Sequence, residues 1–237
     1  VFELSSWRIS ALASLKRSPH IAVITNLYPD HQNYYRSLRN YYADKANIFR
    51  FQKTKDFLIA NADNEAMREI AQDAPGQLLW FSAAGKTEVP GAWVEEDVIM
   101  YEDQEGAKVL FPLEKIQLQG KHNQANVLAA SLACLAYGLK PKDIRSGVET
   151  FAGVKHRMEL GAEHGGVRYI NDSAATIPEA AFEAIRSFDA GKLILLGGGS
   201  DKELDLTGFA DAHRPLKPVN LFAGAGTQKI LKALEGK

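Results

Sequence analysis

Short apolar runs alternate with more polar stretches along the first part of the chain. Three runs, at residues 20–25, 56–61 and 77–82, are rich in β-branched or aromatic residues and predict buried strands. The stretches between them, 33–50 and 64–73, predict helices. Strands that alternate with helices indicate βαβ units, so we expect an α/β fold with a mainly parallel sheet.

The pattern changes further along the chain. Residues 88–118 hold short strand-like runs with a glycine-containing turn, which predicts a meander. Helices are predicted at 123–138 and 141–151, the second with Pro141 at a favoured first-turn position. A new cycle then begins near residue 156. Its predicted strands are 167–172, 192–199 and 218–226, and its predicted helices are 178–188 and 227–234.

The linker between two domains is predicted at residues 151–156, which places the domains at 1–152 and 153–237. The opening stretch, VFELSSWRIS, is strand-like and lacks an initiator Met. We therefore expect the chain to begin inside a domain.

The composition narrows the class of protein. The chain has 237 residues, 46% hydrophobic and 24% charged, with a net charge of −1, so charge gives no reason to expect nucleic acid or membrane partners. The single cysteine, Cys134, lies among alanines and leucines, so we expect its side chain to be buried as a small hydrophobic group. A chain with one cysteine cannot form an internal disulfide, which fits a reducing cytoplasm. No signal peptide is visible, and the apolar run at 127–139 is too short to span a bilayer, so we expect a cytoplasmic protein.

The stretch SAAGKTEVP, residues 82–90, contains the GK[ST] end of a phosphate-binding loop. That loop needs a glycine five positions before Gly85, where this chain has Trp80. The stretch also leads into the predicted meander and not into a helix. We expect a plain surface turn here.

Two further stretches place polar groups where a nucleotide would bind. Residues 26–35 follow a predicted strand and contain His31, an imidazole suited to a metal or phosphate, although it also fits a helix start. In GKHNQAN, Asn123 fits a helix N-cap. A cap does not explain Asn126, one turn later on the same face, where two amides can contact the edge of a purine.

Polar residues also end two strands of the second domain. The stretch YINDSAAT ends its strand with Asn171, Asp172, Ser173 and Thr176. An acidic residue at a strand end suits a ribose, and the alternative is an Asx turn that caps the helix near Pro178. The Gly-rich stretch 195–205 carries Lys202, a candidate for binding an anion.

Seven motifs in order resemble the Mur ligases of peptidoglycan synthesis: ELSSW, TNLYPDH, YYADKANIF, GKHNQANVLAA, GVKHRME, YINDSAAT and GGGSDKELD. The most similar group adds D-glutamate to UDP-N-acetylmuramoyl-L-alanine. The resemblance implies that 1–152 is most of a central ATP-binding domain and that 153–237 is a partial, Rossmann-like glutamate-binding domain. The family's UDP-binding domain and P-loop have no counterpart in these residues, so we expect this chain alone to be inactive.

The resemblance also implies ATP and Mg²⁺ as cofactors. Glu3, His31 and Lys45 correspond to magnesium ligands, Lys45 as a carbamate, which gives a hard cation the oxygen donor it prefers. Asn123 and Asn126 correspond to adenine contacts. The remaining correspondences are Arg157 to a phosphate, Asp172 to the ribose, and Ser173, Thr176 and Lys202 to the acceptor amino acid or the developing phosphate charge.

In this family ATP phosphorylates the muramoyl-peptide carboxylate and the amine of the amino acid displaces the phosphate, so no nucleophilic side chain is required. The glutamate-adding group usually has a lysine where this chain has Ala174, which leaves D- and L-glutamate both open. Two alternatives remain. A folylpolyglutamate synthase-type ligase is expected to carry a DGAHNP-like stretch where this chain has NDSAATIP, and the absent P-loop fits a non-catalytic nucleotide-binding module.

Overall fold

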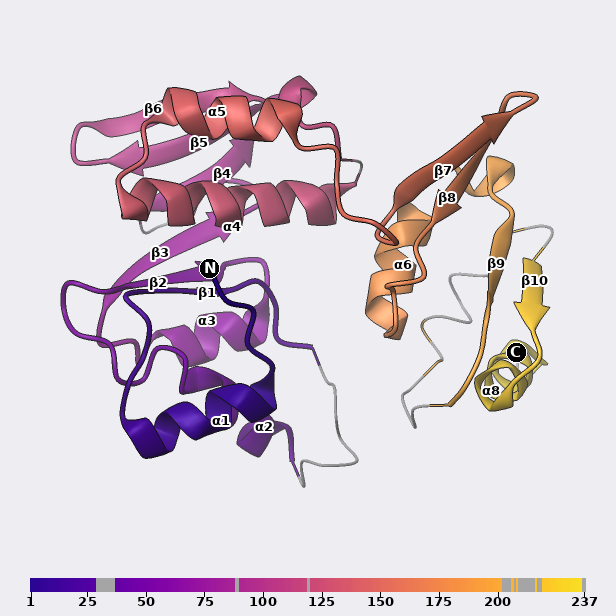
Figure 1. Cartoon of the computed structure of the whole chain (residues 1–237), viewed down its shortest axis with the longest axis horizontal. Coiled ribbons are helices and arrows are strands. Elements are labelled where there is room, and N and C mark those ends of the chain that lie inside the picture. The colour runs from indigo at the N-terminus through magenta and orange to yellow at the C-terminus, as the bar shows by residue number, and fades with distance from the viewer. Residues whose placement is uncertain are drawn as a thin grey trace. The chain divides into compact units, whose positions relative to one another are not determined.

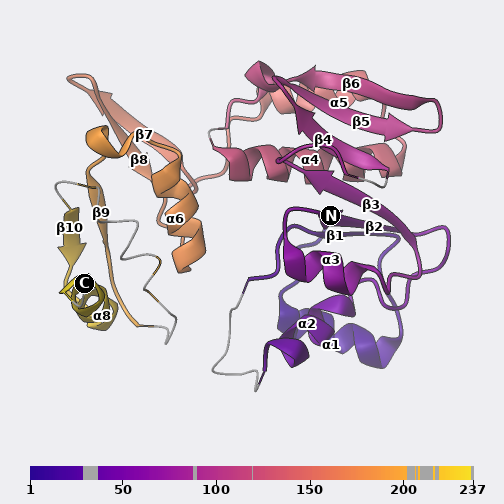
Figure 2. The same ribbon diagram turned by 180° about the vertical axis from the view of Figure 1, so that it is seen from behind.

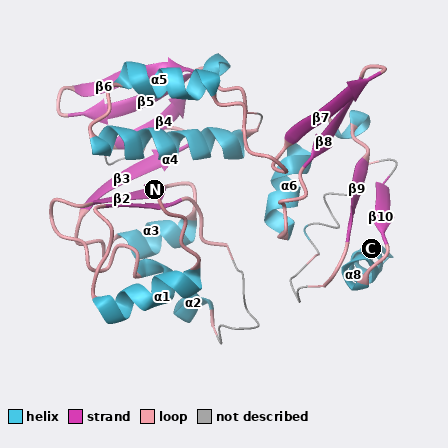
Figure 3. Ribbon diagram, viewed as in Figure 1, coloured by secondary structure: helices cyan, strands magenta, loops and turns pink. Residues whose placement is uncertain are grey.

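The computed structural model describes residues 1–28, 37–87, 90–118, 120–201, 206, 208, 216 and 219–235. The chain forms two compact units, Val1–Phe151 and Ala152–Lys237. Each unit contains both helices and strands, as Figure 3 shows.

A single sheet organises the first unit. Among the described residues it has six strands in the order β1 (Ile21–Ile24), β2 (Phe57–Asn61), β3 (Gln77–Ser82), β4 (Gly91–Glu95), β5 (Val98–Asp103) and β6 (Gly106–Pro112). The first four strands are parallel, and β4, β5 and β6 pair antiparallel. The predicted α/β fold with a mainly parallel sheet and the predicted meander are both confirmed.

Helices cover both faces of this sheet (Figures 1 and 2). On one side lie α1 (Ser6–Leu15), α2 (Leu38–Ala46) and α3 (Glu65–Ala71); on the other lie α4 (Lys121–Tyr137) and α5 (Pro141–Thr150). Pro141 occupies the first turn of α5, as predicted. A short 3-10 helix, Leu113–Lys115, precedes α4.

Side chains of the central strands alternate between two cores. Leu58 and Ala60 of β2 pack in one core with Met67 of α3. The residue between them, Ile59, packs in the other core with Leu128 of α4. Because successive strand residues point to opposite faces, a strand covered on both sides reads as an unbroken apolar run. This is why the apolar runs of the sequence marked β1, β2 and β3.

The prediction of a strand-like start to the chain is wrong. Residues from Ser6 form helix α1, preceded by Ser5 in an extended conformation, and Ile9 of this helix is buried. Packing of one apolar residue per turn outweighs the weak strand preference of the stretch. Helix α2 begins at Leu38, later than predicted, after Ser37 whose side chain accepts a hydrogen bond from the helix backbone.

The second unit contains two small sheets. Strands β7 (Glu159–His164) and β8 (Val167–Asn171) form an antiparallel hairpin, and β9 (Leu195–Gly198) and β10 (Val219–Phe222) are parallel. Its helices are α6 (Pro178–Arg186), the 3-10 helix Ala190–Lys192 and α8 (Ala225–Glu235). The three predicted strands and two predicted helices are present. Strand β7 was not predicted, because ELGAEH has few strand-favouring residues and depends on its partner β8.

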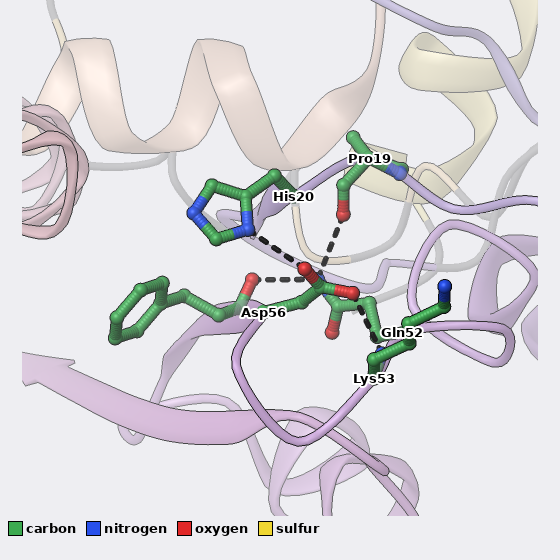
Figure 4. A network of polar contacts seen from close by, with 6 residues as sticks. Pro19, His20, Gln52, Lys53 and Asp56 are labelled. Atoms are coloured by element: carbon green, nitrogen blue, oxygen red, sulfur yellow. Dashed lines mark hydrogen bonds and ion pairs between the residues drawn. The ribbon is translucent and has the colours of Figure 1, made fainter.

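A polar cluster ties together the starts of β1 and β2 (Figure 4). His20 Nδ1 lies 2.7 Å from Asp56 Oδ1, and Asp56 Oδ2 accepts from the Lys53 N–H at 2.6 Å. Gln52 Nε2 donates to the carbonyl oxygens just before β1 and at the start of β2, at 3.1 and 2.7 Å. This cluster lies at the amino ends of the two strands.

Helices that could cross a membrane are absent from the described part of the chain, since none combines the necessary length and apolar character.

Candidate functional site

The first turns of α4 hold the two asparagines singled out in the sequence. Asn126 Nδ2 donates to Asn123 Oδ1 at 3.3 Å, so their side chains meet one turn apart, as expected. Asn123 is buried, whereas Asn126 is exposed. The interpretation of Asn123 as an N-cap is wrong, because Gly120 occupies that position and Asn123 N donates to the Gly120 carbonyl at 3.0 Å. A buried amide therefore orients an exposed one at a helix N-terminus.

Of the three predicted magnesium ligands, the structure describes Glu3 and Lys45, while His31 lies outside the described residues. Glu3 is exposed ahead of α1. Lys45 is half-buried on α2, with its Nζ 5.0 Å from the centre of the Tyr41 ring. No group of three His, Cys, Asp or Glu side chains suited to a metal occurs within the described ranges, which leave out His31. The magnesium site stays a prediction.

A network at the carboxyl ends of β1, β2 and β3 was not foreseen from the sequence. Asn61 Nδ2 donates to Asn26 Oδ1 at 3.0 Å, which joins the ends of β2 and β1. The Asp63 carboxylate accepts from Ser82 Oγ at 2.6 Å and from the Ala83 N–H at 2.7 Å, which joins β2 to β3. Polar residues directly after each apolar run were the available signal, because parallel strands end at one edge.

The conformation of the GKT stretch depends on Ser82, which also belongs to this network. Ser82 Oγ accepts from the backbone N–H groups of Ala84 and Gly85, at 3.0 and 3.2 Å, and forms a tight turn. The chain next enters β4 and not a helix. The predicted surface turn is confirmed, and these backbone donors are used inside the protein.

In the second unit, the structure brings Arg157 and Asp172 to neighbouring loops. Asp172 is half-buried after β8, and its Oδ1 accepts from the Met158 N–H at 3.0 Å. Arg157 is exposed in the turn that this contact holds, and its N–H donates to the Val154 carbonyl at 3.2 Å. The loop after β8 and the turn around Arg157 thus form one polar surface.

The remaining predicted residues of this unit lie on the same loop or are not described. Ser173 and Thr176 are both exposed, and Lys202 lies outside the described residues. The Ser173 N–H donates to Asn171 Oδ1 at 3.1 Å, so an Asx turn is present as the alternative supposed. It does not cap α6, whose N-cap is Ile177 without a side-chain hydrogen bond.

Cys134 is half-buried on α4 and packs against the core. Burial raises the pKa of its thiol, because an apolar surrounding disfavours the thiolate. Since the thiolate is the nucleophilic form, this cysteine is poorly suited to catalysis.

Comparison with known proteins agrees with this architecture. The Mur ligase middle domain matches residues 1–134. The UDP-N-acetylmuramoylalanine–D-glutamate ligase of Roseiflexus sp. (strain RS-1) is 37% identical over 99% of this chain and 52% of its own length. That of Koribacter versatilis (strain Ellin345) is 38% identical over 100% of this chain and 51% of its own length.

Solved structures show the same fold at low identity. MurF from Acinetobacter baumannii covers 98% of this chain, over 55% of its own, with a TM-score of 0.70 and 19% identity. MurF ligase from Thermotoga maritima in complex with ADP covers 91% of this chain, over 51% of its own, with a TM-score of 0.64 and 18% identity.

The α/β fold and the match to the middle domain define the class: the chain belongs to the Mur ligase family. Within that family, its similar relatives carry the name UDP-N-acetylmuramoylalanine–D-glutamate ligase. The chain spans about half the length of these curated relatives.

Proposed function

We propose that the full-length protein containing this chain is a cytoplasmic, ATP-dependent ligase that adds glutamate to UDP-N-acetylmuramoyl-L-alanine in peptidoglycan synthesis. The observation that carries the proposal is the 37% identity to a D-glutamate ligase over 99% of the chain, which includes both units. The two alternatives, a folylpolyglutamate synthase-type ligase and a non-catalytic module, are not favoured by these relatives.

Each unit carries residues that we propose as contacts of ATP. Asn123 and Asn126 contact adenine, and the buried Asn123 amide supports this role because it orients the exposed Asn126 amide. Asp172 contacts the ribose and Arg157 a phosphate. An exposed guanidinium on a hydrogen-bonded turn suits an anion, since Arg presents several N–H donors in a fixed geometry. The ADP bound to the T. maritima relative supports a nucleotide as ligand of this fold.

The reaction needs positioning and charge neutralisation more than side-chain chemistry. A carboxylate oxygen of the muramoyl peptide attacks the γ-phosphorus, and ADP leaves. The glutamate nitrogen then attacks the acyl carbon, the bond to the phosphate oxygen breaks, and phosphate departs. Arg157 and Lys202 offset charge that develops on phosphate oxygens, and Ser173 and Thr176 offer hydroxyls to the acceptor.

Magnesium fits the predicted donor set in kind, because a carboxylate of Glu3 and a carbamate on Lys45 would supply the oxygen atoms that a hard cation prefers. His31 is the third predicted ligand. Lys45 is half-buried and not sealed in the core, as carbamate formation requires. When bound, the ion supplies charge neutralisation at the phosphates.

The test is a ligation assay of the full-length protein with UDP-N-acetylmuramoyl-L-alanine, ATP and a panel of acceptors. We expect phosphate release that depends on glutamate and not on L-Ala, L-Lys or diaminopimelate. A preference for a neutral or basic amino acid would overturn the glutamate assignment. L-Glu over D-Glu would keep it and revise the stereochemistry.

Ala174 offers a sharper version of this test. It is exposed beside Ser173 and lacks the cation usual at this position, so we expect Ala174→Lys to lower the KM for glutamate about tenfold or more, the strength of one charge-assisted contact. The matched control is Ala180→Lys, which adds the same charge to an exposed position of α6. Equal effects of both variants would mean that only net charge matters.

A further inference from the structure

Arg157 lies between two non-glycine residues with a left-handed backbone. His156 has φ of 65° and Met158 has φ of 50°. This conformation costs an L residue roughly 1–2 kcal/mol. It persists where neighbouring contacts hold it, and such residues cluster at functional sites.

Contacts from the loop after β8 hold the backbone on each side of Arg157. The Ala174 N–H donates to the His156 carbonyl at 2.9 Å. The Met158 N–H donates to Asp172 Oδ1 at 3.0 Å. Both left-handed residues are therefore fixed to the carboxyl end of one strand.

Further contacts close the turn from within. The His156 N–H donates to Glu159 Oε2 at 2.8 Å, and the Arg157 N–H donates to the Val154 carbonyl at 3.2 Å. The Arg157 guanidinium itself is exposed and makes no hydrogen bond or ion pair to the residues that the structure describes. The backbone is fixed while the charged group is left for a ligand.

The side chains of His156 and Asn171 form a further contact, and its donor and acceptor can be assigned. Asn171 Oδ1 accepts from the Ser173 N–H at 3.1 Å, so its Nδ2 faces His156 Nδ1 at 2.9 Å. A flipped amide would set two donors against each other at Ser173. Since Asn171 Nδ2 is a donor, His156 Nδ1 must accept. In this contact the ring proton lies on Nε2.

We propose that Asn171 is a positioning residue that holds His156, and through it the left-handed turn that aims Arg157 at the phosphate. This inference rests on the proposed function, in which Arg157 contacts a phosphate. Loss of the Asn171 contact frees the turn on one side, and a displacement of about 1 Å at a catalytic group can cost on the order of a hundredfold in rate.

Glu159 is an alternative partner for His156 Nδ1. Glu159 Oε2 lies 3.8 Å from His156 Nδ1 in the same turn. Lys155 and Arg157 flank it in the chain. A proton on Nδ1 ends the contact with Asn171 and favours Glu159 instead.

The test uses Asn171→Asp and Asn171→Ala in the full-length protein. An aspartate still accepts from the Ser173 N–H but offers only an acceptor to His156 Nδ1, so the proton of a neutral ring moves from Nε2 to Nδ1. We expect Asn171→Asp to show this proton on Nδ1 in the imidazole ¹⁵N signals and to keep more of the wild-type kcat than Asn171→Ala. We expect Asn171→Ala to lower kcat about tenfold or more, with the KM for glutamate unchanged.

The matched control is Asn220→Asp, which makes the same chemical change at an exposed position of β10. It should keep the wild-type kcat and the His156 proton on Nε2. If Asn171→Ala also keeps the wild-type kcat, Asn171 has no positioning role. A proton on Nδ1 in Asn171→Asp, together with a lowered kcat in Asn171→Ala, supports it.

A measurement on the wild-type protein separates this inference from the proposed function. The imidazole ¹⁵N signals of His156 should show the proton on Nε2 at neutral pH, whatever reaction the protein catalyses. A proton on Nδ1 overturns the inference even if the ligase is active. An inactive wild type with the Nε2 proton instead overturns the proposed function and leaves the contact in place.

Discussion

At the scale of single residues, polar side chains at the two ends of the strands have different roles. At the carboxyl ends, Asn26, Asn61 and Asp63 link neighbouring strands. At the amino ends, Asp56 takes a hydrogen bond from His20 and another from the Lys53 N–H (Figure 4). These contacts favour the ionised carboxyl, so the pKa of Asp56 is lowered.

The lowered pKa gives a prediction for stability. Because the folded pKa lies below the unfolded one, ionised Asp56 stabilises the fold above the ordinary carboxyl pKa, and the effect is lost as pH falls through the lowered value. We expect Asp56→Asn to lower the thermal midpoint at neutral pH, with a difference from the wild type that shrinks toward acid. Thermal unfolding across this range measures it. Asp73→Asn, at an exposed position, is the control, and a constant difference for Asp56→Asn would contradict the prediction.

At the scale of elements, the close approach of β3 and β4 depends on Gly91. A Cβ on Gly91 would lie 1.8 Å from the Trp80 carbonyl oxygen. Trp80 pairs with Gly91 in the parallel register that joins the meander to the first three strands. The absence of a side chain at this one position thus allows the sheet to continue.

Gly91→Ala is therefore expected to lower the free energy of unfolding by at least about 3 kcal/mol, because backbone atoms must move apart. Gly147→Ala is the matched control: it lies in α5 with nothing within 4 Å of the added Cβ. There we expect a gain of roughly 0.5–1 kcal/mol from helix preference. Urea unfolding of both variants measures the contrast, and equal effects would show that Gly91 is not needed for the strand pairing.

At the scale of the whole molecule, the two units differ in the size of their cores. The first unit holds both large apolar clusters around the six-stranded sheet. In the described part of the second unit, the buried apolar side chains are Ile185, Leu216 and Ile230. Two-stranded sheets with few buried side chains are marginally stable.

We expect the second unit of this 237-residue chain to unfold at a lower urea concentration than the first. All three tryptophans, Trp7, Trp80 and Trp93, lie in the first unit, so their fluorescence follows that unit alone. Hydrogen exchange of β7, β8 and α6 follows the second. Coincident transitions by the two measurements would mean that the units unfold as one.

Local patterns in the sequence were sufficient for most of the fold and for the family. Apolar runs marked β1, β2 and β3, and Pro141 marked the start of α5, because these signals depend on neighbours in the chain. Motif order indicated the Mur ligases, and the match to residues 1–134 agrees. The paired asparagines of α4 were found because helix periodicity places them together.

Only the tertiary structure decided the features that are formed by residues far apart in the chain. Helix α1 replaced a predicted strand because Ile9 packs into the core. The hydrogen bond from Asn171 to His156 spans 15 residues and depends on both ends of the β7–β8 hairpin. Left-handed backbone at His156 is disfavoured locally and exists because these contacts hold it. Sequence periodicity reports which face of an element is buried, whereas the partner that it meets there is set only by folding.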